Sequence, residues 1–140
     1  MKTEQLIIVK KELELLKKHL AHSDLSEFNR NKLLAELKSA KIMKEQELPD
    51  DVVCLDSKID IQEMTSKQTF TFHLVLPSEA NMKQKKISVF APIGIALLGY
   101  RKGSIVQWEM PNGLKTFEIL RVVQHVSQET SDLATDGISQ

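Results

Sequence analysis

The first 47 residues contain neither proline nor glycine, and this constrains the fold more than any other feature of the sequence. Both residues interrupt helices, so a long stretch without them favours helical structure. Apolar side chains recur in this stretch at alternating spacings of three and four residues, at Leu6, Val9, Leu13, Leu16 and Leu20. That is the 3.5-residue period of a coiled-coil seam. The pattern predicts a first helix over residues 3–22.

A second helical stretch follows the short segment "AHSD" at residues 21–24. Lysine and glutamate fill the charged faces of both stretches, which leaves each with a narrow apolar stripe. Two such helices with a short connection predict an antiparallel helical hairpin, a short coiled coil, over residues 1–47. The alternative is a pair of core helices packed on the rest of the chain. The apolar side of the second stretch consists of Phe28, Leu33, Leu37, Ala40 and Met43.

After "LPDD" at residues 48–51 the period of the apolar residues changes to two. In "TFTFHLVL" (69–76) every second residue is a large apolar one, which predicts a strand. "KIDI" (58–61) and "KISVF" (86–90) predict two more strands. "PIGIALLG" predicts a short helix, because Pro92 suits a first helical turn and Gly99 suits the position after the last.

The segments "SIVQWEM" (104–110) and "LKTFEILRVV" (114–123) flank "PNG" (111–113). An Asn-Gly pair between two strand patterns predicts a β-hairpin. Residues 48–126 are therefore predicted to form an α+β domain, an antiparallel sheet with one short helix. Residues 127–140 are polar and lack lysine and arginine, so we expect them to be disordered.

The overall composition excludes several functional classes. Lysine and arginine total 19, as do aspartate and glutamate, so no net charge favours direct binding to DNA. The single cysteine, Cys54, cannot form an internal disulfide. No apolar run reaches membrane-spanning length, and the first residues lack the features of a signal peptide. We expect a soluble cytoplasmic protein, and a monomer.

The stretch "SVFAPIGIALLGYRKGS" (88–104), followed by "VQWEMPNGLKTFEIL", resembles the C-terminal domain of the Gre transcript-cleavage factors and of their relative Rnk. The segment "LPDDVVCLDSKIDIQEM" is more similar to Rnk than to Gre. The sequence departs from the Gre pattern at Ala91, where a serine is usual, and at Ser104, where an acid is usual. The shared signature, Pro-x-Gly-x-x-Leu-Leu-Gly, falls on Pro92, Gly94, Leu97, Leu98 and Gly99.

This resemblance implies an N-terminal helical hairpin followed by an FKBP-like domain. It also implies a regulator of transcription elongation that binds core RNA polymerase at the secondary channel and is not itself an enzyme. Polymerase docking would involve the short helix and the loops beside it. The candidate docking residues are Pro92, Ile93, Gly94, Tyr100, Arg101 and Lys102.

The hairpin tip carries Asp24-Leu25-Ser26-Glu27, which matches the Asp-Leu-x-Glu motif of the Gre family. The resemblance implies that Asp24 and Glu27 help to hold a transient Mg²⁺ shared with the polymerase, an ion that prefers carboxylate oxygens. Asp24 and Glu27 also fit a capping box, in which Asp24 is the N-cap. We expect no stable metal or cofactor. The first helix spans at most about 30 Å, less than the Gre hairpin, so polymerase binding is favoured over stimulation of cleavage.

An FKBP-like fold also raises the alternative of a peptidyl-prolyl isomerase, whose activity needs an apolar aromatic pocket. Tyr100 and Trp108 are the two amphipathic aromatic residues of the chain, and we expect Trp108 to lie in the core. The basic segment "MKQKK" (82–86) is a solvated loop or a contact for an acidic partner. The four histidines, at positions 19, 22, 73 and 125, show no spacing typical of a metal site.

Overall fold

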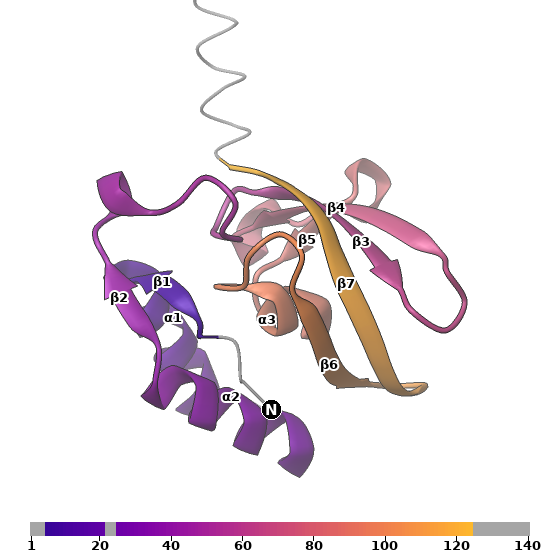
Figure 1. Ribbon diagram of the computed structural model, residues 1–140, viewed down its shortest axis with the longest axis horizontal. Helices are drawn as coiled ribbons and strands as arrows, with labels where there is room; N and C mark the ends of the chain where they lie inside the picture. Colours follow the sequence, from indigo (N-terminus) through magenta and orange to yellow (C-terminus); the bar gives the residue numbers. More distant parts are fainter. Residues whose placement is uncertain (1–4, 22–24, 125–140) are drawn as a thin grey trace, which may run out of the picture.

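The computed structural model describes residues 5–21 and 25–124, which form two parts packed against each other (Figure 1). We call residues 5–47 the N-terminal unit and residues 48–124 the sheet domain. The N-terminal unit contains two short strands that pair in parallel, two helices that lie between them in the sequence, and a final 3-10 turn, Glu45–Glu47. Its elements are β1 (Ile7–Val9), α1 (Lys10–Ala21), α2 (Glu27–Lys38) and β2 (Lys41–Met43).

The sheet domain contains a five-stranded sheet with strand order β5-β4-β3-β7-β6. Neighbouring strands are antiparallel except β4 and β5, which run in parallel. The mixture of helices with a largely antiparallel sheet confirms the predicted α+β class. The elements are β3 (Lys58–Glu63), β4 (Thr69–Val75), β5 (Lys86–Ser88), α3 (Pro92–Leu97), β6 (Ile105–Met110) and β7 (Gly113–Val123).

The strands follow the predicted period of two. On β3, Ile59 and Ile61 are buried, whereas Asp60 between them lies on the opposite, more exposed face. The hairpin between β6 and β7 is also confirmed: Met110 pairs with Gly113, so residues 111 and 112 form a two-residue turn. Gly113 has φ +122°, a backbone conformation that glycine adopts without strain.

The short helix α3 has the predicted boundaries. Pro92 occupies its first position, and Gly99 follows the last turn with φ +90°. Gly94 is required for a different reason, because a Cβ atom there would lie 2.7 Å from the carbonyl oxygen of Ser88. The missing side chain lets α3 approach the end of β5 closely.

The single long helix predicted over residues 3–22 is wrong, because Ile7–Val9 form a strand and α1 begins only at Lys10. The backbone N–H of Ile7 donates to the carbonyl of Gly99 at 3.0 Å. The backbone N–H of Lys41 donates to the carbonyl of Leu6 at 2.8 Å. These bonds tie β1 to both β2 and the sheet domain, which satisfies its backbone groups without a helix.

The predicted coiled-coil hairpin is not confirmed. Leu6 and Leu16 are each 1% exposed, and they share one hydrophobic core with Ile95 and Trp108 of the sheet domain. The apolar stripe of the N-terminal unit therefore packs on the sheet domain, as in the alternative arrangement, and α2 bonds to β6 through Asn29 and Glu109.

Candidate functional site

The six candidate docking residues divide into a surface group and a buried group. Pro92 is exposed at the start of α3, and Ile93 beside it is half-buried. Arg101 and Lys102 are exposed in the turn that precedes β6. Gly94 is buried, so the surface available to a partner is the start of α3 together with this turn.

Tyr100 is the second buried residue of the predicted group, at 5% exposure. Its hydroxyl accepts a hydrogen bond from Nζ of Lys32 at 3.0 Å, and this Nζ also lies 2.6 Å from Oε2 of Glu36. Tyr100 therefore joins α2 to the sheet domain. This position serves packing between the two parts of the molecule and leaves little of its ring for a partner.

The turn at residues 101–103 is held by Asp51, which lies in the segment before β3. Nε of Arg101 lies 3.1 Å and Nη2 lies 3.0 Å from Oδ1 of Asp51, and the backbone N–H of Lys102 donates to the carbonyl of Asp51 at 2.9 Å. Both charged side chains are solvent-exposed, so the ion pair contributes at most about 1 kcal/mol. The ion pair orients the turn, and Lys102 stays exposed.

A groove of about 470 Å³ adjoins Pro92, and both parts of the molecule line it. We call it the α3-edge groove. Trp108 lies in its wall and is 1% exposed, and Nε1 of this residue has no hydrogen-bond partner within the described part of the chain. The groove is lined by Leu25, Ser26, Asn29, Pro92, Trp108, Glu109, Met110, Pro111 and Gly113.

Asn29 fixes one wall of this groove and was missed by sequence reasoning. Its Nδ2 donates to the carbonyl of Glu109, and its Oδ1 accepts from the N–H of Glu109, each at 2.8 Å. The amide thus pairs with the edge of β6 as a neighbouring strand would. The buried side of α2 consists of Asn29, Leu33 and Glu36, spaced i, i+4 and i+7, whereas Phe28 of the predicted apolar side is 41% exposed. Because Asn29 and Glu36 are polar, the pattern of apolar residues did not indicate this buried face.

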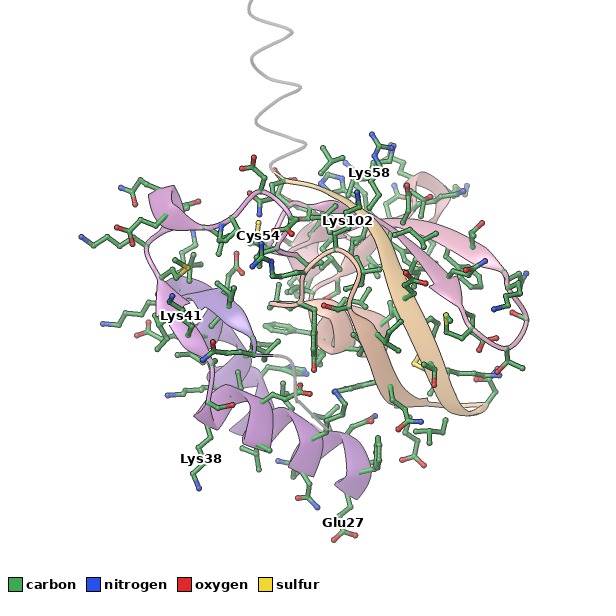
Figure 2. All side chains as sticks on the ribbon, in the orientation of Figure 1. Glu27, Lys38, Lys41, Cys54, Lys58 and Lys102 are labelled. Atoms are coloured by element: carbon green, nitrogen blue, oxygen red, sulfur yellow. The ribbon has the colours of Figure 1, made fainter. Side chains whose placement is uncertain are left out.

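Of the two tip acids, Asp24 lies outside the described residues. Glu27 is the first residue of α2, and its side chain is exposed and points away from the molecule (Figure 2). The N-cap of α2 is Ser26, whose Oγ accepts from the N–H of Asn29 at 3.2 Å. The predicted capping box is therefore wrong, because it places the N-cap at Asp24, two residues before the observed N-cap.

Glu12 forms another contact between the two parts. Its Oε2 accepts from the backbone N–H of Leu55 at 2.9 Å, and the side chain is 7% exposed. Burial raises the pKa of Glu12 to about 7; the negative charge of Glu45 contributes to this rise, and the hydrogen bond from Leu55 opposes it. The carboxyl therefore changes charge near neutral pH at the boundary between the N-terminal unit and the sheet domain.

Among the described residues, neither the histidines nor Cys54 line the α3-edge groove. His19 stacks on Phe90 with ring centroids 4.2 Å apart, and His73 pairs with Asp56. The other two histidines lie outside the described residues, and the described ones contain no cluster suited to a metal ion. Burial raises the pKa of Cys54 to about 12, so its thiol is unreactive at neutral pH.

Comparison with known proteins identifies relatives of both parts. The family model "Transcription elongation factor, GreA/GreB, C-term" matches residues 48–124. "Regulator of nucleoside diphosphate kinase" from Escherichia coli K12 is 35% identical over 91 residues, 64% of this chain and 67% of that protein. "Transcription elongation factor GreA" from Clostridium botulinum Eklund 17B is 32% identical over 124 residues, 78% of each chain.

A solved structure shares most of the architecture. The GreA/GreB elongation factor from Nitrosomonas europaea aligns with a TM-score of 0.65 at 30% identity, and covers 86% of this chain and 99% of its own. The similarity therefore extends beyond the sheet domain into the N-terminal unit. In the part of the chain that the structure describes, no helix has the length and apolar character needed to cross a membrane.

Proposed function

The chain belongs to the GreA/GreB family of transcription elongation factors, and we propose that it binds core RNA polymerase and regulates elongation at the secondary channel. Family membership carries this proposal, and it favours an elongation regulator over a prolyl isomerase. The geometry adds exposed positions suited to docking: the start of α3 beside a groove, and the basic turn at residues 101–103.

We propose that the polymerase contacts Pro92, Ile93 and Lys102. Pro92 lines the α3-edge groove and is exposed, and Ile93 next to it in the sequence is half-buried. Apolar surface of this kind supports binding when a partner covers it. The backbone N–H of Lys102 bonds to Asp51, so the turn that carries this exposed lysine is held in place before binding. A positive charge at the surface favours the encounter with an acidic partner surface.

We further propose that the protein regulates the polymerase without supplying a cleavage activity. α1 has 12 residues, about 18 Å at 1.5 Å per residue, and it packs on the sheet domain. The N-terminal unit in this arrangement is a short, docked body instead of a long arm. Asp24 and Glu27 would at most assist a Mg²⁺ ion bound by the polymerase itself.

A binding assay with purified core RNA polymerase tests the proposal. The wild-type chain should be retained, and Lys102→Glu should weaken binding about tenfold or more, because reversal of a contact charge adds repulsion. Lys67→Glu is the matched control, since Lys67 is an exposed lysine in the turn between β3 and β4. Failure of the wild type to bind would refute the function, whereas equal effects of the two substitutions would refute only the docking surface.

A further inference from the structure

A second groove, of about 590 Å³, lies between the N-terminal unit and the segment of the sheet domain that precedes β3. We call it the linker groove. Its volume falls in the range of sites that bind small molecules or short peptides. It is lined by Val9, Lys10, Lys11, Glu12, Ile42, Met43, Lys44, Glu45, Gln46, Leu55 and Asp56.

The charges that this groove presents to solvent are mainly positive. Lys10, Lys11 and Lys44 are exposed, and Glu45 is the exposed acid among the lining residues. The other two acids are engaged, Glu12 with the backbone of Leu55 and Asp56 with His73. The apolar part of the lining comes from Val9, Ile42, Met43 and Leu55. An occupant that complements this groove is an acidic segment with an apolar side chain among its acids.

The chain leaves the described structure beside this groove. Nε2 of Gln124 donates to the carbonyls of Pro49 and Val52, each at 2.7 Å. Pro49 is three residues from Gln46 and Val52 is three residues from Leu55, so each anchor lies within about 11 Å, Cα to Cα, of a lining residue. Gln46 and Leu55 both line the groove, so the end of β7 is anchored to residues close in sequence to its lining.

The residues that follow have the required composition. Residues 125–140, outside the described part of the chain, contain three acids and no lysine or arginine. Two of these acids flank an apolar residue in "DLATD", Asp132 to Asp136, with Leu133 between them. From Gln124 to Leu133 an extended chain reaches about 30 Å, which exceeds the separation of at most about 11 Å between each anchor residue and the groove lining.

We propose that residues 125–140 bind back into the linker groove, with Leu133 against its apolar lining and Asp132 and Asp136 beside Lys10 and Lys44. The segment is an internal ligand that secures the N-terminal unit to the sheet domain, which goes beyond polymerase binding. Attachment to the same chain gives it an effective concentration in the millimolar range. A contact of millimolar affinity then suffices to slow exchange of covered amides by roughly two- to tenfold.

Hydrogen exchange on the 140-residue chain tests this proposal: charges are changed either in residues 125–140 or in the groove, and exchange is measured in the other of the two. Asp132→Lys/Asp136→Lys should speed exchange at residues 42–46 by roughly two- to tenfold. Lys10→Glu/Lys44→Glu should speed exchange at residues 125–140 to a similar extent. The four substitutions combined restore opposite charges, so they should recover most of the protection.

Lys67→Glu/Lys83→Glu is the matched control, because both lysines are exposed and neither lines the groove. It should leave exchange in both segments unchanged. Unchanged exchange at residues 42–46 in the Asp132→Lys/Asp136→Lys chain would overturn the proposal. Protection that grows with protein concentration would also overturn it, since the segment would then bind a second copy of the chain.

Discussion

The sheet domain and the N-terminal unit both show strong apolar periodicity, but only the sheet domain pairs its elements as its sequence predicts. β6 and β7 are adjacent in the sequence, and the turn between them fixes which residues face each other. The leucines of α1 form an equally regular stripe, yet they pack on a domain that begins some 30 residues later. An apolar stripe indicates that one face of a helix is buried, but it does not identify the part of the chain that covers this face.

The largest effect should come from a leucine shared by both regions. Leu16→Ala removes a side chain that is 1% exposed, so it should lower the free energy of unfolding by about 3 kcal/mol. Denaturant unfolding followed by the fluorescence of Trp108, in the sheet domain, should report this loss. Leu34→Ala is the control, because Leu34 is 47% exposed and should cost less than about 0.5 kcal/mol. A Trp108 transition unchanged by Leu16→Ala would mean that the two regions unfold separately.

The boundary between the regions should also make stability depend on pH through Glu12. Its pKa is about 7 in the folded chain, against an ordinary value of 4.5. The folded state holds the proton more tightly, so the free energy of unfolding falls as pH rises from about 4.5 to about 7. Glu12→Gln keeps an acceptor for the Leu55 N–H without the charge. It should stabilise the chain by about 2 to 3 kcal/mol at pH 8 and hardly at all at pH 4.

Thermal unfolding across that pH range provides the measurement for Glu12. Glu14→Gln is the matched control, since Glu14 is exposed on the same helix and should have little effect at either pH. An equal effect of Glu12→Gln at pH 4 and pH 8 would show that the carboxyl is not buried at the boundary.

A smaller effect should follow from the loss of the amide that joins α2 to β6. Asn29→Ala leaves the N–H and carbonyl of Glu109 without these partners, and should cost about 1 to 2 kcal/mol. Asn31→Ala, at an exposed position of α2, should be nearly neutral. Amide exchange at Glu109 should accelerate only in the first variant. If the two variants behave alike, Asn29 does not hold the helix to the sheet.

The start of α2 offers the smallest stability change. Ser26→Ala should cost about 1 kcal/mol, because Ser26 is the N-cap. Asp24→Ala should then be almost neutral in a thermal melt. A larger loss of stability from Asp24→Ala than from Ser26→Ala would instead support the capping box in which Asp24 is the N-cap.

Local sequence signals were sufficient for much of the sheet domain, because Pro92, Gly99 and the turn before Gly113 act within a few residues. The α3-edge groove was only partly predicted: Pro92 was found, whereas Asn29 was not. Asn29 bonds to a residue 80 positions away, and Glu12 to one 43 positions away. Such contacts leave no local periodicity, and a polar side chain on a helix usually indicates a solvated face. The burial of Tyr100 likewise depends on the packing of α2, which the sequence did not reveal.

The most direct test of the account is transcript cleavage by backtracked elongation complexes, with binding of the chain to the polymerase measured in the same samples. The docked N-terminal unit predicts that saturating wild-type chain binds and leaves the cleavage rate within about twofold of polymerase alone, a difference of less than about 0.5 kcal/mol in activation free energy. Strong stimulation that Asp24→Asn or Glu27→Gln abolishes, with binding and stability unchanged, would contradict the account and make these two acids a functional cleavage tip.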